Sequence, residues 1–342
     1  MRVLSVQQPG NGVAYHRQWL PLMEMPDVDV LFADFLNDEV LHRGWDIVLI
    51  NRHIPGMELE TLLDYRKRYD FKLVVDIDDY WHLDPWHILS HTYPTAKIIE
   101  HIKAADLVTC THERLRKAIR EYNRAVEILP NALPYDRGQF HSERIKSEDV
   151  TKGRLRISYI GSVTHEKDME LLRGPWKRLA SEQYIRDRTH FILCGFSDGG
   201  PRPVVEAWRR MLSVYLSGFK LEGYARAPIE PEKYMAFYCE ADAVVAPLVD
   251  SRFNGMKSNL KVLEAAAKRI PVLVSAVHPY LDSPYAIHCK SGIDWVRNIR
   301  ELVKSKKMRE DFGMENAAWA REYFHLDNWN KVRRQIYDKL IA

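Results

Sequence analysis

Three charged side chains in the stretch 253–264 are of types that could bind an anionic ligand. Lys257, Lys261 and Glu264 stand at spacings of four and three, so a helix over 256–268 would carry them on one face. Two lysines at the first spacing repel each other near the positive end of the helix dipole, which favours a bound anion such as a phosphate. Glu264, one turn deeper, could accept hydrogen bonds from a sugar diol. A solvated amphipathic face would explain the lysines equally well.

A second cluster consists of carboxylates that follow a predicted strand at 72–75. Asp76, Asp78 and Asp79 lie so close together that they repel one another unless each has a partner. They could supply a general base, hold sugar hydroxyls, or bind Mg²⁺ or Mn²⁺, and helix capping is the structural alternative. The long loop that follows is rich in aromatic and histidine side chains, but their spacing matches no zinc motif: His82, Trp86, His87 and His91.

A glycine turn is predicted where the second half of the chain begins. Gly161 and Ser162 follow a buried-strand pattern and precede a helical one. Lys167 could reach a phosphate, and Asp168 suits the positive end of the helix dipole. His165 is a candidate catalytic residue, although a lone histidine is more often structural.

The first predicted strand, at 3–6, also runs into a glycine loop. Gly12 ends a Gly-x-Gly pair, but Tyr15 occupies the place of the third glycine of a dinucleotide-binding fingerprint. The loop therefore indicates a close approach of backbone to a ligand rather than a nicotinamide or flavin site. Tyr15, His16 and Arg17 would follow it into a cleft, and a solvent-exposed first turn is the alternative.

Alternating strands and helices predict an α/β fold with two doubly wound parallel sheets, one in each half of the chain. The strands are expected at 3–6, 28–32, 47–50, 72–75, 107–109, 126–129, 156–160, 190–194, 220–223, 243–246, 271–274 and 286–288. The helices are expected at 14–25, 57–69, 95–104, 113–122, 167–181, 204–216, 231–239, 256–268, 295–305, 307–324 and 327–340. Two such halves would face each other across a cleft.

Length and composition are those of a globular protein with two domains. The 342 residues are 46% hydrophobic and 28% charged, and a formal charge of +3 does not by itself indicate nucleic acid binding. The four cysteines form neither a metal-spacing motif nor a disulfide framework, which favours a reducing cytoplasm. No signal peptide and no apolar run of the length of a membrane span is apparent, so we expect no transmembrane segment.

The ordered set of motifs resembles the GT-B nucleotide-sugar glycosyltransferases, specifically the retaining family four and its phage and bacterial relatives. The resemblance spans nearly the whole chain in family order, at 10–17, 74–81, 105–109, 129–132, 160–168 and 257–266. It implies two Rossmann-like domains: an acceptor-side domain at 1–140, a linker at 141–154, a nucleotide-sugar-binding domain at 155–325, and a terminal helix at 326–342 that crosses back to the first domain.

The resemblance also implies roles for particular residues. Glu264 would hold the donor ribose, and the diphosphate would be held by Lys167, Lys257 and Lys261. Further donor contacts are expected from Gly12, Gly161, Ser162, Asp168, Asn254 and Ser258. The catalytic candidates are Asp76, Asp78, Asp79 and His165, and the acceptor-side candidates are Tyr15, His16, Arg17 and Trp81.

One position departs from the family pattern. Met256 stands where the family often carries a second glutamate, eight residues before Glu264. Asp250, Arg252 or Asn254 could take over its contacts with the donor sugar. The resemblance further implies a UDP-sugar as co-substrate, no required metal or cofactor, and transfer with retention of the anomeric configuration.

Four other functions remain open on the sequence. The acceptor could be a hydroxymethylated pyrimidine in phage DNA instead of a glycan, and the Trp- and His-rich loop after Asp79 is compatible with a flipped base. The chain could instead be a metal-dependent hydrolase built on Asp76–Asp79. It could also be a non-catalytic sugar-nucleotide binding module or a nucleotide-sugar epimerase.

Overall fold

The N-terminal half of the chain is built on one parallel sheet. The structure is a computed structural model that describes residues 1–8, 10–144, 153–216 and 221–342. The sheet has the strand order β2-β1-β3-β4-β5-β6, and every neighbouring pair is parallel. Its strands are β1 (Arg2–Val6), β2 (Asp29–Ala33), β3 (Ile47–Asn51), β4 (Lys72–Ile77), β5 (Leu107–Cys110) and β6 (Val126–Ile128). The central strands are almost entirely apolar and buried because helices cover both faces.

The C-terminal half repeats this architecture with a second parallel sheet, ordered β12-β11-β10-β7-β8-β9. Its strands are β7 (Leu155–Ile160), β8 (Thr189–Cys194), β9 (Gly223–Arg226), β10 (Ala243–Ala246), β11 (Val272–Ser275) and β12 (Ile287–Cys289). The two sheets confirm the predicted α/β fold with two Rossmann-like domains.

The helices of the N-terminal half are α1 (Gly12–Ala14), η1 (Tyr15–Trp19), α2 (Leu20–Met23), α3 (Asp38–Leu41), α4 (Leu59–Tyr69), α5 (Thr95–Ala104), α6 (Glu113–Ile119) and η2 (Gly138–Phe140). Those of the C-terminal half up to β10 are η3 (Val163–His165), α7 (Glu166–Met169), η4 (Glu170–Leu172), α8 (Arg173–Ala180), α9 (Gln183–Arg186), α10 (Arg202–Tyr215), η6 (Pro231–Lys233) and α11 (Ala236–Glu240). After β10 come η7 (Asn254–Met256), α12 (Leu260–Ala267), η8 (Tyr280–Asp282), α13 (Gly292–Lys304), α14 (Lys306–Tyr323) and α15 (Leu326–Ile341).

Three expected elements differ from the structure. The helix expected at 256–268 is only α12, because Lys257 is extended (ψ 168°) and residues 257–259 form no helix. The helix expected at 167–181 is broken into short segments, and Pro175 near the start of α8 lacks the amide that a continuous helix would use. The strand expected at 220–223 is β9, which starts at Gly223, and residue 220 lies outside the described residues.

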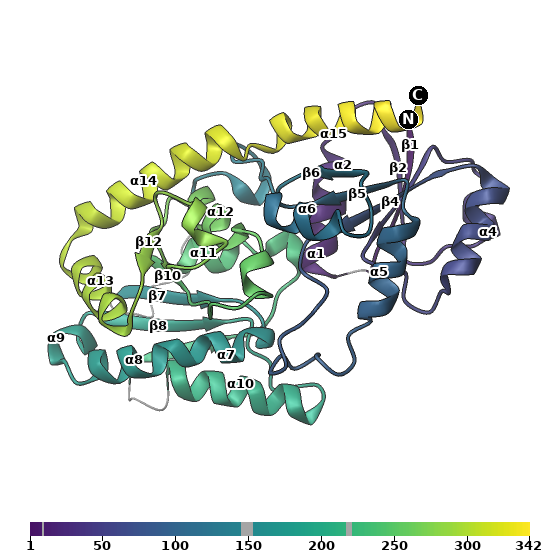
Figure 1. Cartoon of the computed structure of the whole chain (residues 1–342). Coiled ribbons are helices and arrows are strands. Elements are labelled where there is room, and N and C mark those ends of the chain that lie inside the picture. Colours follow the sequence, from purple (N-terminus) through teal and green to yellow (C-terminus); the bar gives the residue numbers. More distant parts are fainter. Residues whose placement is uncertain (9, 145–152, 217–220) are drawn as a thin grey trace.

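The two domains are joined by two segments that lie side by side, one at Leu133 and one at His325, and by the C-terminal helices. Leu133 pairs with residues on either side of His325: its amide donates to Phe324 O (3.0 Å), and its carbonyl accepts from the Leu326 amide (3.1 Å). Figure 1 shows α14 and α15, in yellow, running over both domains along one side, with both chain termini at the N-terminal domain. Tyr337 of α15 is buried in an apolar cluster with Val3 and Ile47 of the first sheet.

No helix in the described part of the chain is both long enough and apolar enough to span a lipid bilayer.

Gly313 lets α14 lie directly on the turn after α12. A Cβ added at this position would lie 2.2 Å from the backbone oxygen of Arg269, closer than side chains tolerate. We expect Gly313→Ala to lower the free energy of unfolding by roughly 1–3 kcal/mol, the usual cost of overpacking. Urea unfolding of wild type and variant measures the difference.

Gly174 provides the matched control for this substitution. It also lies in a helix, α8, but nothing lies within 4 Å of the Cβ that an alanine would add. Because alanine has the higher helix propensity, Gly174→Ala is expected to raise stability by up to about 1 kcal/mol. Equal effects of the two substitutions would contradict the close packing of α14 on Arg269.

Candidate functional site

The two sheets direct the carboxyl ends of their strands toward the space between the domains. In each sheet the strand order reverses next to the first strand, between β1 and β3 and between β7 and β10. Ligands of open parallel sheets bind outside the carboxyl ends at such reversal points. The loops that leave β1, β3, β4, β7 and β10 carry the residues described next, so the topology assembles them at one place.

The core of the site is a buried ion pair on α12. Lys261 Nζ lies 3.3 Å from Glu264 Oε2, and only 1% of the Glu264 side chain is exposed. Burial alone would raise the pKa of Glu264, but the Lys261 ammonium and hydrogen bonds from His16 and Tyr238 outweigh burial and lower the pKa to about 2. Glu264 is therefore a permanent carboxylate at neutral pH.

Side chains from both domains surround this pair. Tyr238 donates its hydroxyl hydrogen to Glu264 Oε2 (2.6 Å), and Lys261 Nζ donates to the Tyr234 hydroxyl (2.9 Å). From the N-terminal domain, His16 Nε2 lies 3.4 Å from Glu264 Oε1. Segment η1 of one domain and α11 and α12 of the other therefore meet at a single carboxylate.

The lowered pKa of Glu264 predicts a loss of stability in acid. A carboxylate whose folded pKa lies below its ordinary value of 4.5 stabilises the fold above that pH, and this contribution is lost as the pH falls from 4.5 toward 2. The shift corresponds to about 3 kcal/mol. Urea unfolding at pH 7, 4.5 and 3 should therefore show a steeper acid loss in wild type than in Glu264→Gln. Parallel pH profiles would contradict the ionised pair.

A second ion pair bridges the two domains. Lys257 Nζ lies 3.4 Å from Asp79 Oδ2, and Arg52 Nη2 lies 3.6 Å from the same oxygen and 2.8 Å from Asp78 Oδ1. Burial would raise the pKa of Asp79, but Lys257 and Arg52 more than offset it, so the pKa is lowered. For Asp78 burial outweighs Arg52, and the pKa is raised.

The chain between β10 and α12 reaches across to the N-terminal domain. Phe253 is buried in the apolar core of that domain together with Tyr80 and Trp81, and Met256 packs against the same cluster. His112 Nε2 lies 2.9 Å from Met256 O, and Arg114 Nε donates to Gly255 O (3.1 Å). Asn131 donates to Ser258 Oγ (2.7 Å), and Ser251 donates to Asp84 (2.7 Å). Met256, at the position where the resemblance would place a second glutamate, thus packs against the apolar core of the other domain.

A third group fixes His165 at the reversal point of the second sheet. Its Nδ1 lies 2.7 Å from Asp168 Oδ2. The other oxygen of Asp168 accepts hydrogen bonds from the Val249 amide (2.7 Å) and from Asn254 Nδ2 (2.9 Å). Asp168 and Asn254 are buried, and their hydrogen bonds hold His165 and the loop after β10 in position.

The structure places Asp76 and Arg17 outside the cleft surface. Asp76 is 2% exposed, and both of its oxygens are occupied: Arg17 Nη2 (2.7 Å) and Thr109 (2.6 Å) donate to Oδ1, and Arg17 Nε (2.9 Å) to Oδ2. Arg17 also donates to Leu129 O (2.7 Å). Because a buried carboxylate and guanidinium require each other, this pair belongs to the interior of the N-terminal domain.

Other expected site residues lie in the core or on the open surface. Tyr15 stacks on Trp19 with ring centroids 5.4 Å apart, and Trp81 is buried beside Tyr80, so neither ring is available to an acceptor. Both rings are large and mostly apolar, which favours burial. Tyr15 also lies in the first helical turns after β1, which face the core. The exposed ones, Gly12, Ser162 and Lys167, are not drawn into the ion pairs; Gly161 is partly buried beside Tyr159.

Sequence reasoning missed several residues of the site. Arg52 directly follows β3, and the same carboxyl-end rule that singled out Asp76–Asp79 could have found it. His112 follows β5 in the same way. Tyr234 and Tyr238 carry no such signal, because they reach Glu264 only through the packing of η6 and α11 on α12.

The carboxylates that the sequence offers as possible metal ligands each pair with a different basic side chain. Asp76, Asp78 and Asp79 are paired with Arg17, Arg52 and Lys257, respectively. Within the described residues, a group with metal-like ligand spacing is found elsewhere, at Asp136, His325 and Asp327. Arg137 forms ion pairs with both aspartates of that group.

Comparison with known protein families gives a match in the C-terminal half. Residues 154–304 match the family model described as glycosyl transferases group 1. No curated protein matches the chain in sequence.

Solved structures with similar folds cover both domains. Anabaena Alr3699/HepE, in complex with UDP and glucose, matches with a TM-score of 0.65 at 12% identity over 99% of this chain and 100% of its own. Sucrose-phosphate synthase from Thermosynechococcus elongatus matches with a TM-score of 0.68 at 14% identity, over 100% and 99%. A trehalose-6-phosphate protein from E. coli bound with UDP-2-fluoro glucose matches with a TM-score of 0.66 at 11% identity, over 100% and 99%. At these identities the likeness establishes the fold.

Proposed function

We propose that this protein transfers a sugar from a UDP-sugar to an acceptor hydroxyl, with retention of configuration, because residues 154–304 match the model of the group 1 glycosyl transferases and the whole chain has the GT-B fold. The observation that carries the proposal is the Lys261–Glu264 pair beside Lys257, at the reversal point of the second sheet and between the two domains. Two of the similar structures hold UDP or a UDP-sugar.

In this proposal the donor diphosphate binds at the N-terminus of α12. That helix has no acidic residue in its first turn and no side-chain cap, so its first amides are free to receive an anion. Lys257 would exchange Asp79 for a phosphate oxygen, and Lys261 would keep one side toward Glu264. The ribose hydroxyls would donate to Glu264, which is ionised and can accept them.

The transfer itself breaks the bond between the anomeric carbon and the diphosphate oxygen and forms a bond from that carbon to the acceptor oxygen on the same face. The acceptor proton passes to the leaving diphosphate. Lys257, Lys261 and the amides of α12 stabilise the charge that develops on this group, which is usually the largest catalytic contribution. His165, oriented by Asp168, and Asp79 on the opposite side would position the reacting sugar and acceptor.

The acceptor would bind along the loop after Asp79. Trp86 and Leu89 of this loop are 50% and 43% exposed, and an exposed indole can stack on a sugar ring or on a base. We favour a glycan acceptor. A gel shift with duplex DNA containing hydroxymethylated pyrimidine separates the alternatives, since salt-sensitive binding would indicate DNA.

A metal-dependent hydrolase is the less favoured function because a basic side chain already pairs with each carboxylate of Asp76–Asp79. We propose that the reaction requires no metal, because the lysines neutralise the charge of the diphosphate in place of a metal ion. Unchanged turnover in EDTA supports this, and activity restored only by Mg²⁺ or Mn²⁺ would favour the hydrolase.

We also propose that the protein works in the cytoplasm. Cys110, Cys194, Cys239 and Cys289 are all free thiols, and three of them are buried in the sheets, where oxidation is disfavoured.

Thermal unfolding with UDP, GDP and dTDP tests the donor assignment. A ligand that binds only the native state stabilises it by about 2.7 kcal/mol at a concentration of 100 times its Kd, so UDP is expected to raise the Tm the most. Glu264→Gln should lose most of this shift. If no nucleotide raises the Tm of the wild type, or if Glu264→Gln responds like the wild type, the proposal is wrong.

A further inference from the structure

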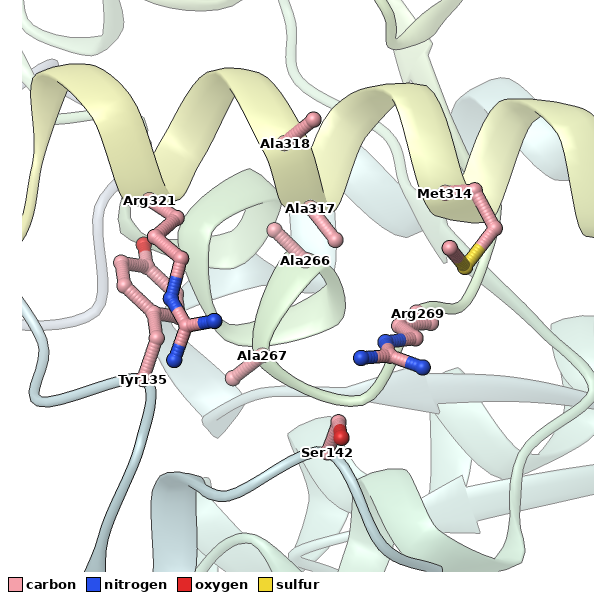
Figure 2. Close-up of a pocket in the computed structure, with 9 residues that line it drawn as sticks. All are labelled: Tyr135, Ser142, Ala266, Ala267, Arg269, Met314, Ala317, Ala318 and Arg321. Atoms are coloured by element: carbon pink, nitrogen blue, oxygen red, sulfur yellow. The ribbon is translucent and has the colours of Figure 1, made fainter.

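A cavity of about 270 Å³ lies behind α12, on the side away from the Lys261–Glu264 pair. Ala266 and Ala267 of α12, Met314 and Ala317 of α14, and Tyr135 and Ser142 from the segment that joins the domains line it. Figure 2 shows Arg269 and Arg321 at opposite ends, with both guanidinium groups turned toward the space between the alanines and Ser142. Apolar walls with convergent polar groups are typical of a small-ligand site.

The polar groups of this cavity lack partners. In the part of the chain that the structure describes, neither Arg269 nor Arg321 forms a side-chain hydrogen bond or an ion pair, in contrast to Arg17 and Arg52. Tyr135 is 6% exposed, and its buried hydroxyl has no hydrogen-bond partner among these residues. Because Arg269 and Arg321 are exposed, water solvates both guanidinium groups in the free protein, but two cations that face the same space favour an anion between them.

We propose that the cavity binds a small organic phosphate, whose phosphate group lies between Arg269 and Arg321 and whose apolar part contacts the alanines and Met314. Two guanidinium groups match the double negative charge of a phosphate monoester, and each can donate two parallel hydrogen bonds to it. The cavity volume limits the organic part to a few carbon atoms or one ring.

The location gives the site a direct relation to the donor helix. Ala266 and Ala267 face the cavity, while Glu264 on the same helix meets His16 of the N-terminal domain. Burial, and then the negative charge of Glu264, raise the pKa of Tyr135. A ligand here would contact α12 and both segments that connect the domains.

Calorimetric titration with phenyl phosphate tests the proposal. We expect about tenfold weaker binding in Arg269→Gln and in Arg321→Gln, and loss of measurable binding in the double variant. Arg202→Gln, on an exposed side chain of α10, and Lys257→Gln, in the cleft, should bind phenyl phosphate as the wild type does. Binding that survives the double variant, or that disappears in Lys257→Gln, would show that the phosphate occupies another site.

Tyr135→Phe provides a second readout. Because the hydroxyl has no partner in the free protein and points away from the space between the two guanidinium groups, its removal should leave phenyl phosphate binding unchanged and leave the Tm unchanged or raise it. Markedly weaker binding in Tyr135→Phe would show that the phosphate does not lie between the two arginines. Inorganic phosphate should bind more weakly than phenyl phosphate. Equal affinities would contradict the proposed contact of an organic group with the alanines and Met314. These outcomes are independent of UDP binding, so they do not depend on the proposed transferase activity.

Discussion

Replacement of Lys257 by alanine is expected to reduce the rate of sugar transfer about 100-fold, with little change in stability. In the proposed mechanism the ammonium stabilises the leaving diphosphate, and the loss of one preorganised donor of this kind costs about 10²–10³ in kcat. The fold should tolerate the change because Asp79 keeps Arg52 as a second cationic partner at 3.6 Å. Steady-state kinetics with a UDP-sugar, together with thermal unfolding, measures both quantities.

Two further variants sharpen this prediction. Lys233→Ala removes a lysine of the same domain whose side chain is 75% exposed and whose partner Glu230 is exposed as well, so activity should be unchanged. Lys257→Arg keeps the charge and should retain part of the activity. Wild-type kcat in Lys257→Ala would rule out this lysine as a stabiliser of the leaving group.

Replacement of Asp76 by alanine is expected to lower the free energy of unfolding by about 3–5 kcal/mol, enough to unfold much of the protein. The substitution leaves the guanidinium of Arg17, a residue that is 4% exposed, without its counter-ion and without two charged hydrogen bonds. Burial would lower the pKa of Arg17, but Asp76 more than compensates, so the arginine remains charged in the interior. Urea unfolding followed by circular dichroism measures the loss.

The matched control is Glu58→Ala in the same domain. Glu58 pairs with Lys97 at 2.7 Å, but both side chains are substantially exposed, at 68% and 43%. Water screens such pairs, so at most about 1 kcal/mol should be lost. If Asp76→Ala were as mild as Glu58→Ala and instead abolished turnover in a folded protein, Asp76 would be catalytic, as the sequence alone suggested.

The sequence by itself determined the alternation of strands and helices and the positions at which strands end. Apolar runs such as Val3–Val6 or Ala243–Ala246 predict strands directly, because a strand of a parallel sheet is buried on both faces. The carboxyl-end rule then directed attention to Asp76–Asp79, to Gly161–Asp168 and to Lys257–Glu264, all of which leave strands of the two sheets. Local periodicity is enough for such inferences.

Only the tertiary structure decided which of these charged residues face the cleft. Asp76 and Asp79 are three residues apart, yet Asp76 is buried with Arg17, whereas Asp79 meets Lys257 of the other domain. The spacing of Lys257 from Lys261 predicts a helix. In the structure Phe253 and Met256 pack in the core of the opposite domain, and Lys257, which follows them, is extended. Such long-range packing leaves no periodic trace, since it depends on which surfaces the folded domains present to each other.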